Sequence, residues 1–547
     1  MNRRAKTTIV DRFGGRPQTR CGYCKQCSQR YSHGMWAHCM TAADYQDLID
    51  RGWRRSGQYC YKPNNAITCC PCYTIKCDAK TFQLSKSHKK NLKKVNSYLR
   101  TGQKGGGGGA DNRSIKSDGD NDVQTDHNTD CDMKVDGEEQ KPTEATESSA
   151  LAESKMITSN QPKVSIDIDN VLDIIEKAEN GPKVEATTSS SSANTDGGSV
   201  QKSDTGTCSN RKSSNESNKR GLVAGPDPTK PLQPKAKLLR QQRKAEKQQA
   251  KANTMATDTN VVTPSVSEKM PKNIQKDLKS LIDEIPADGA HKLKLILVNV
   301  ESDEYKRTQS TEFALYTKYQ TQIHHDPPND LSEFLDFLCI SPIKHETPDD
   351  GPTCGYGSFH QQYWLDDKLI AVGVIDILPK CVSSVYFFYD PEYSFLTLGT
   401  YGTLREVQFV RELNESTAEL SEYYMGFYIH SCPKMRYKGK LHPSYLLCPE
   451  TYTWHLINDD ILKLLDESKY SRFNLDPQAS DLNEFNPATD LNHLRLLVDY
   501  KYCLTYRDYK EYKGTEGTDS DEDDFDNFSE YGKLVGKVLS RRLYLVT

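Results

Sequence analysis

Apolar positions are densest between Cys354 and Glu406, and their spacing predicts the elements at the centre of the fold. From Lys368 to Leu378 they run almost without interruption, which predicts a strand covered on both faces. Cys381 to Tyr389, rich in valine and aromatic residues, predicts a second strand. Pro379 fixes the turn between the two, and Asp390-Pro391 ends the second strand.

A glycine-containing loop, a helix and a third strand follow. Gly399 and Gly402 precede Thr403 to Val407, which predicts the start of a helix. The sequence from Glu422 (EYYMGFYIHSC) predicts the third strand. Strand, strand, loop, helix and strand in this order are typical of the centre of a GNAT-type acyltransferase domain. We therefore expect an α+β fold with a GNAT-like core.

Weaker patterns predict elements on both sides of this centre. In the first hundred residues they are a helix over Asp44 to Gly52, a strand over Gln58 to Lys62 and a basic helix from Ser85. In the second half they are strands over His291 to Val300 and Pro443 to Cys448, and helices over Thr311 to Tyr319 and Leu331 to Cys339.

The composition between these two ordered regions predicts a long disordered insertion. Five glycines, Gly105 to Gly109, are followed by a stretch rich in Ser, Thr, Asp, Asn and Lys, which buries too little apolar surface to offset its ordering entropy. Val164 to Ala178 has apolar residues at helical spacing, which predicts either a transient helix or a docking motif. Lys235 to Lys251 predicts a basic helix, either solvated or an RNA-binding arm.

These changes divide the chain into four parts. We expect a cysteine-rich N-terminal domain over 1–100, a disordered linker with a basic helix over 101–270, a GNAT-like transferase domain over 271–510 and an acidic, solvated tail over 511–547.

Composition restricts the compartment. Hydrophobic residues make up 35% of the 547 positions, and no apolar run approaches the roughly 20 residues of a membrane span. The first residues lack the apolar core of a signal peptide. Seventeen cysteines without a secretory signal indicate a reducing compartment in which thiols bind metal or act in redox chemistry. We expect a soluble monomer of the cytosol or nucleus, without a membrane partner.

Nine of these cysteines lie between Cys21 and Cys77, and four form a candidate metal site: Cys21, Cys24, Cys69 and Cys70. Four thiolates satisfy a tetrahedral zinc ion. In an iron–sulfur cube each thiolate binds a different iron, which accommodates two adjacent cysteines more easily. Both cofactors stay open, and the iron–sulfur cluster is favoured. Four nearby cysteines could replace a ligand or be small buried side chains: Cys27, Cys39, Cys60 and Cys72.

Long ungapped segments of the chain resemble eukaryotic arginyl-tRNA–protein transferases. In the second half these are FHQQYWLDDKLIAVGVIDILP, YDPEYSFLTLGTYGTLRE and YYMGFYIHSCPKMRYKG. In the first half they are GGRPQTRCGYC, SHGMWAH, DYQDLIDRGWRRSG, CCPCYTIKC and SKSHKK. The resemblance covers roughly 1–100 and 280–480.

The resemblance implies transfer of arginine from Arg-tRNA to the α-amine of proteins that begin with Asp, Glu or oxidised Cys, which marks them for ubiquitin-dependent degradation. It also implies a [4Fe–4S] cluster on Cys21, Cys24, Cys69 and Cys70. An aminoacyl ester is already activated, so we expect no ATP. We expect no CoA either, because Phe395 to Gly402 has glycines three apart and no leading Gln or Arg, unlike the pyrophosphate loop of GNAT enzymes.

Two rival functions stay open: another GNAT-type acyltransferase, and a non-catalytic adaptor that binds metal and RNA. The central segment contains four candidates for a general base: His360, Tyr363, Asp376 and Glu406. Asp376 could equally bind the arginine guanidinium or only end its strand.

Basic residues supply candidate binding sites for the two substrates. Acidic N-termini require positive charge, which Arg16, Lys86, His88 and Lys89 provide in the cysteine-rich region. The alternatives for the lysines are a solvated face and tRNA phosphate contact. Lys434 and Arg436, after the last core strand, are the candidates for tRNA binding.

Overall fold

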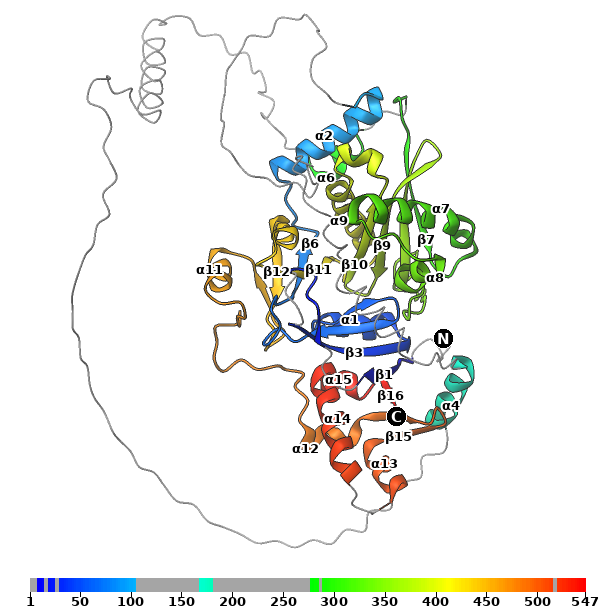
Figure 1. Ribbon diagram of the computed structural model, residues 1–547, viewed down its shortest axis with the longest axis vertical. Helices are drawn as coiled ribbons and strands as arrows, with labels where there is room; N and C mark the ends of the chain where they lie inside the picture. The colour runs from blue at the N-terminus through cyan, green and yellow to red at the C-terminus, as the bar shows by residue number, and fades with distance from the viewer. Residues whose placement is uncertain are drawn as a thin grey trace, which may run out of the picture. The chain divides into compact units, whose positions relative to one another are not determined.

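The computed structural model describes residues 7–13, 18–24, 29–104, 167–180, 276–284, 288–514 and 519–547. These residues belong to one compact unit built on two eight-stranded sheets (Figure 1). The basic helix expected over Lys235 to Lys251 lies outside the described residues. Within them, no helix combines the length and apolar character that crossing a bilayer requires.

The first sheet combines strands from both ends of the chain. Its strands, in spatial order, are β15 (Tyr502–Thr505), β14 (Arg495–Val498), β16 (Tyr544–Val546), β1 (Ile9–Phe13), β3 (Arg30–Cys39), β5 (Tyr59–Pro63) and β4 (Arg54–Ser56), and β2 (Gln18–Thr19) pairs with β3. β1 and β16 are parallel, with Ile9 opposite Tyr544.

The second sheet also mixes the two halves. Its strands, in spatial order, are β13 (Trp454–Leu456), β12 (Ser444–Leu447), β6 (Tyr73–Asp78), β11 (Glu422–Tyr428), β10 (Cys381–Tyr389), β9 (Lys368–Ile377), β8 (Gly357–Leu365) and β7 (Leu293–Asn299). β6 comes from the first hundred residues yet pairs with β11 on one side and β12 on the other. The segments 1–100 and 271–510 therefore share both sheets and are not separate domains.

The pair β10 and β11 differs from the rest of the second sheet. These two strands are parallel, whereas the other pairs of this sheet are antiparallel. They are paired only where Cys381–Ser383 meets Glu422–Tyr424. A register shift in β10 between Ser384 and Tyr386 follows immediately. A bulge bends its strand, so β10 and β11 separate toward their carboxyl ends.

Helices cover both faces of the second sheet. In β9, Val372 and Val374 pack with α7 (Asp303–Tyr319), whereas Gly373, which points to the other face, contacts α9 (Leu398–Ser416). Figure 1 shows α9 with α2 (Lys86–Thr101) and α6 (Leu278–Ile282) beside it. The remaining helices and helical turns are α1 (Ala42–Ile49), η2 (Gln320–His324), α8 (Leu331–Phe334), η3 (Leu335–Cys339), η4 (Pro391–Leu396), α10 (Pro433–Arg436), η5 (Tyr437–Lys440), α11 (Asp459–Glu467), α12 (Pro487–Asp490), η6 (Leu491–His493), α13 (Tyr506–Lys513), α14 (Asp519–Val535) and α15 (Lys537–Ser540).

The predicted strands of the centre are confirmed, but the helix start near Thr403 is wrong. α9 begins at Leu398, so Gly399 and Gly402 lie inside the helix and not in a loop. A Cβ atom at Gly402 would lie 2.3 Å from Cε2 of Phe387 on β10. The absence of a side chain at Gly402 therefore allows α9 to approach the sheet.

The expected solvated tail is also wrong. α14 buries Phe528, Tyr531 and Val535, and β16 completes the first sheet. These three residues follow helical spacing, so the helix has an apolar face next to exposed acidic residues such as Glu522.

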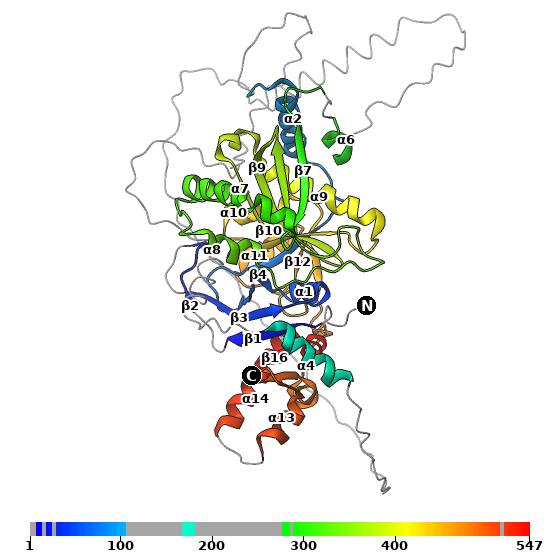
Figure 2. The same ribbon diagram turned by 90° about the vertical axis from the view of Figure 1, so that its right-hand side faces the viewer.

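Part of the insertion docks on the compact unit. α4 (Ile168–Asn180) buries Val171, Leu172 and Ile175 against residues of the first sheet, among them Ile9 and Leu497. Figure 2 shows α4 beside β16 and β1. Of the two predictions for this segment, a transient helix or a docking motif, the docking motif is confirmed, and its partner is the chain itself.

Candidate metal centre and transfer site

Two turns bring four cysteines together. Cys21 and Cys24 follow β2, and Cys69 and Cys70 lie in the loop between β5 and β6. Their sulfur atoms all lie within 4.8 Å of one another, and the Sγ atoms of Cys24 and Cys69 are 3.5 Å apart. These are the four residues that the spacing and the resemblance predict.

Backbone and side-chain hydrogen bonds fix the loop that carries Cys69 and Cys70. The Cys69 N–H donates to the Gln29 carbonyl at 2.9 Å. At the other end, Asn65 accepts from the Cys72 N–H at 2.8 Å and donates to the Cys72 carbonyl at 3.1 Å. Such a loop presents its thiols in one geometry before any metal binds.

The four sulfurs share protons unequally. The pKa of Cys21 is lowered to about 4, chiefly by the hydrogen bond from the Cys70 thiol. Burial, together with hydrogen bonds to Cys21 and Cys24, raises the pKa of Cys69 to about 12. Cys21 is therefore the thiolate of the group, with thiol donors around it, and the binding of a metal would release the remaining protons.

The donor set fits a thiophilic metal. Zn–S bonds of about 2.3 Å place four tetrahedral sulfurs roughly 3.8 Å apart, close to the separations here, all below 4.8 Å. A cube requires wider spacing, because each thiolate binds a different iron. The site can therefore hold a metal.

The described extra cysteines do not join this group. Burial raises the pKa of Cys39 to about 11 and that of Cys60 to about 12. The Cys72 thiol donates to the carbonyl of Cys70 at 3.3 Å. Cys27 lies outside the described residues.

The metal centre borders the separated end of β11. Phe427 and Ile429 pack in the same apolar cluster as Cys21 and Cys70. The Ser431 hydroxyl lies 3.9 Å from the Cys70 sulfur. The sequence after β11 therefore connects the metal centre to the diverging strands.

Glu406 lies at the point where β10 and β11 diverge. It is 1% exposed, and the Tyr423 hydroxyl of β11 donates to its Oε2 at 2.6 Å. Burial raises the pKa of Glu406 to about 7, against the opposing effect of hydrogen bonds from Tyr423 and Ser384. Its Oε1 has no hydrogen-bond partner within the part of the chain that the structure describes, and it lies 2.8 Å from where a Cβ atom on Gly373 would be.

Tyr363 lies on the same face of the sheet as Glu406. Its hydroxyl donates to Gln361 at 2.7 Å, and its ring contacts Phe387 with centroids 5.8 Å apart. Of the four predicted bases, Tyr363 and Glu406 share this face, and the charge of Glu406 contributes, after burial, to raising the pKa of Tyr363.

His360 is on the opposite face. Its Nδ1 lies 2.5 Å from Oε2 of Glu312, and its Nε2 lies 3.1 Å from the carbonyl of Leu338. Since both ring nitrogens face acceptors, the ring is held as a doubly protonated cation. Burial opposes this state, but Glu312 prevails and raises the pKa of His360.

Asp376 is paired inside the protein. Arg55 donates from Nε at 2.9 Å and from a terminal nitrogen at 2.6 Å, and Ser358 donates at 2.6 Å. The exposed fractions of the two charged side chains are 1% and 0%. Asp376 thus binds a guanidinium, but it is that of its own chain.

The predicted basic residues are distributed over different parts of the unit. Lys86, His88 and Lys89 lie on α2, which packs on α6 and α9; among the described residues, none of α2 belongs to the apolar cluster around the metal centre. His88 accepts from the Ser85 N–H at 3.2 Å as part of a capping box. Lys434 and Arg436 lie on α10, next to the metal centre, and Arg16 lies outside the described residues.

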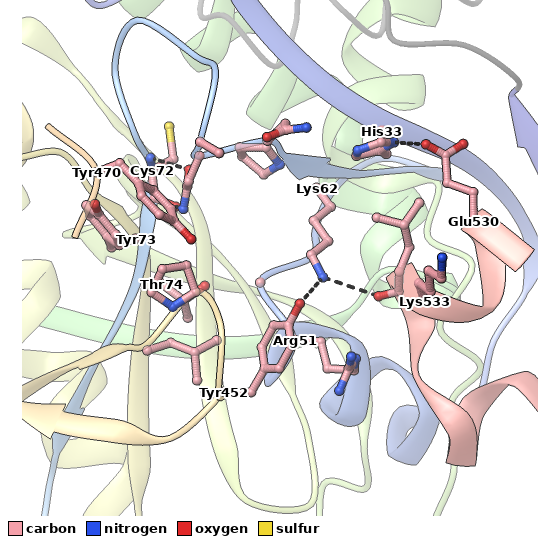
Figure 3. Close-up of a pocket in the computed structure, with 18 residues that line it drawn as sticks. His33, Arg51, Lys62, Cys72, Tyr73, Thr74, Tyr452, Tyr470, Glu530 and Lys533 are labelled. Carbon is pink, nitrogen blue, oxygen red and sulfur yellow. Dashed lines mark hydrogen bonds and ion pairs between the residues drawn. The ribbon is translucent and has the colours of Figure 1, made fainter. Parts of the chain in front are cut away.

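Sequence reasoning missed a cavity of about 310 Å³ beside the metal-binding loop (Figure 3). Arg51, Lys62, Thr74 and Tyr452 are among its lining residues. The available signal was Lys62, a charged residue inside the predicted strand Gln58 to Lys62.

Comparisons with known proteins agree with the resemblance. Residues 19–90 match a family model described as the N terminus of arginine-tRNA-protein transferase, and residues 311–448 match one described as its C terminus.

Full-length relatives show the same relationship. "Arginyl-tRNA--protein transferase 1" of Drosophila melanogaster is 44% identical over 98% of this chain and 99% of its own length. "Arginyl-tRNA--protein transferase 2" of Arabidopsis thaliana is 32% identical over 84% of this chain and 76% of its own. An "Aspartate/glutamate leucyltransferase" of Campylobacter jejuni is 35% identical over 16% of this chain and 34% of its own length. The chain therefore belongs to the arginyl-tRNA–protein transferase family.

Proposed function

We propose that this chain moves arginine from Arg-tRNA to the α-amine of proteins with N-terminal Asp, Glu or oxidised Cys, marking them for ubiquitin-dependent degradation. The observation that carries the proposal is the 44% identity to an arginyl-tRNA–protein transferase over 98% of the chain. As a family member the chain is an arginyltransferase; the acceptor residues and the link to degradation belong to the proposal.

A GNAT-like core is part of the proposal. Three features support it: the parallel pair β10 and β11 with its short pairing, the register shift in β10 and the helix α9 between the two strands. Because the two strands pair only at Cys381–Ser383 and Glu422–Tyr424, they diverge toward their carboxyl ends, and we propose that an extended substrate lies there.

The reaction requires placement more than strong basicity. The amine nitrogen attacks the ester carbonyl carbon, the bond to the tRNA ribose oxygen breaks, and the proton that the amine loses ends on that oxygen as the peptide bond forms. An α-amine has a pKa near 7.7–8.0, so a weak base suffices and orientation supplies much of the acceleration.

Glu406 is the candidate base that the geometry favours among the four. Its pKa of about 7 is close to that of the amine, and its Oε1 has no hydrogen-bond partner. It also accepts a hydrogen bond from Tyr423 on β11, where β10 and β11 begin to diverge. His360 and Asp376, in contrast, have charged partners inside the protein.

For the metal centre we propose an iron–sulfur cluster, with zinc as the alternative. The adjacency of Cys69 and Cys70 supports the cluster, and the short sulfur separations support zinc. Anaerobic purification followed by iron, sulfide and zinc analysis separates the two. The centre borders β11, so loss of the metal would alter the transfer rate; an unchanged rate in a folded protein counts against this link.

Substrate binding and cellular state complete the proposal. Lys434 and Arg436 would contact tRNA phosphates, since they follow β11 on a short surface helix. We propose a monomer in the cytosol or nucleus; the free thiols of all described cysteines are typical of a reducing compartment.

The decisive test is anaerobic incubation with charged [³H]Arg-tRNA and two peptides, one beginning with Asp and one with Ala. Label on the Asp peptide alone is expected. Label on neither peptide, with the protein folded and metal-loaded, would leave the non-catalytic adaptor. Binding of CoA with transfer of an acyl group would support the other acyltransferase.

A further inference from the structure

The cavity of about 310 Å³ is lined by residues from parts of the chain that are far apart in sequence. Lys62 and Thr74 come from the ends of β5 and β6 that flank the metal-binding loop, Tyr452 comes from the turn after β12, and Lys533 comes from α14. Figure 3 shows Lys62 extending between Tyr452 and α14.

Among the described residues, Lys62 has no counter-ion. Its Nζ donates to the Tyr452 hydroxyl at 2.8 Å and to the Leu534 carbonyl at 3.2 Å, and it lies 4.7 Å from the centre of the Tyr452 ring. An ammonium has three donors, so one is left. No described carboxylate lies within ion-pair distance of it. A partly buried cation without a counter-ion is costly, and an anionic ligand removes that cost.

Two residues that line the same cavity each have a buried donor without an acceptor among the described residues. The Arg51 guanidinium stacks 4.1 Å from the centre of the Tyr452 ring and donates to Asp481 at 2.8 Å, but its buried Nε has no partner. Thr74 is 2% exposed, and its hydroxyl has no partner either. Buried donors are normally paired, so the three groups together indicate an absent acceptor.

The local charge is positive. Arg51, Lys62 and Lys533 line the cavity, and Glu530 is the carboxylate among its lining residues. Glu530 is already used, because it pairs with Arg12 and faces His33.

We propose that this cavity binds the side-chain anion of the acidic N-terminal residue of the protein substrate. The inference rests on the proposed function. It assigns recognition of the acidic N-terminal residue to Lys62, Arg51 and Thr74, and not to the basic residues of α2. Oxidised cysteine carries a sulfinate or sulfonate, so the same donors would accept it.

Position and size favour a protein terminus over tRNA. Thr74 is the register partner of Phe427 on β11, and neighbouring strands lie about 4.8 Å apart, so one side chain spans the distance from the cavity to β11. The cavity is walled by Tyr73, Tyr452 and Tyr470, whereas phosphate contacts are typically made by exposed lysines.

The cavity is also joined to the metal centre. Asn65 lines it and holds Cys72, two residues after the ligand candidate Cys70, through two hydrogen bonds. A change at the metal would reach the cavity through this short loop.

The test uses the full chain with its metal and measures KM separately for an Asp-initiated peptide and for Arg-tRNA. Lys62→Met removes the charge and keeps the aliphatic stem, Thr74→Val removes only a hydroxyl, and Lys306→Met changes a lysine whose side chain is 68% exposed. Lys89→Met tests α2. Calorimetry of peptide binding without tRNA gives an independent value of Kd.

Lys62→Met is expected to raise the peptide KM and Kd about ten- to a hundredfold, and Thr74→Val about threefold to tenfold, with the KM for Arg-tRNA unchanged. Lys306→Met should match the parent chain in both KM values, and Lys89→Met should leave the peptide KM unchanged. A rise in the KM for Arg-tRNA instead would show an RNA phosphate site and overturn the inference.

Unchanged values for both cavity variants in folded protein would also overturn it. If Lys62→Met does not fold, Thr74→Val decides alone. If the parent chain transfers no arginine to the Asp peptide, the proposed function fails. If the parent chain transfers arginine normally and the cavity variants have the same KM values as the parent, only the inference about the cavity fails.

Discussion

Breaking the buried pair of Arg55 and Asp376 tests whether Asp376 is structural or catalytic. Arg55 lies on β4 in the first sheet and Asp376 on β9 in the second, and two hydrogen bonds of 2.9 and 2.6 Å join them. Both side chains are at most 1% exposed. The pair therefore connects the two sheets at a place that solvent does not reach.

The size of the effect follows from this burial. Removing one member of a buried pair leaves the other charge uncompensated, which costs about 3–5 kcal/mol. Asp376→Asn and Arg55→Met should each lower the free energy of unfolding by about that amount. The double variant Arg55→Met/Asp376→Leu should lose less than the sum, because neither charge stays behind. Asp303→Asn, a control in an exposed pair whose side chains are 68% and 86% exposed, should cost at most about 1 kcal/mol.

Urea unfolding monitored by circular dichroism and fluorescence measures these differences. The rate of arginine transfer is measured in parallel at a temperature where each variant is folded. Unchanged stability of Asp376→Asn, together with a loss of kcat of about a hundredfold or more, would refute the structural reading and make Asp376 catalytic.

Three further predictions concern the core, the metal centre and α4. Glu406 has a pKa of about 7 in the folded chain and 4.5 as its ordinary value, so its ionisation destabilises the folded chain as the pH rises from 4.5 to 7. The free energy of unfolding of Glu406→Gln should therefore exceed that of the parent by about 3 kcal/mol at pH 8 and be almost equal to it near pH 4.5. Urea unfolding midpoints at the two pH values measure this difference. Cys69→Ser should lose bound metal in elemental analysis while Cys72→Ser keeps it, and equal metal content in both would contradict the ligand set. Ile175→Asp should release α4 and cost about 2 kcal/mol of docking, seen as faster hydrogen exchange over 167–180; exposed Asp169→Ala is its control, and equal protection in the two would contradict the docking.

Local sequence was sufficient where one segment contains its own signal. The strand Lys368 to Leu378 was predicted because its apolar run is continuous, and β9 follows it. The four cysteines were predicted from their spacing together with the resemblance, and they meet in space.

Sequence was insufficient where the partner lies elsewhere in the chain. The residues of β6 do not indicate that this strand pairs with β11, which lies more than 300 positions later in the chain. The acidic density around Asp521 concealed the apolar face of α14. The free donor of Lys62 is evident only when Tyr452 and Leu534 are placed beside it.

The mixing of both chain ends in each sheet has a consequence for synthesis on the ribosome. β1 pairs with β16, whose last residue is Val546, and β6 pairs with β11 and β12, which are synthesised much later than β6. The N-terminal strands therefore emerge long before their neighbours, and contacts of such high sequence separation form slowly. During that interval the strand edges and the cysteine thiols of the nascent chain are unprotected. A chaperone that shields them is consequently most useful before the C-terminal residues are made.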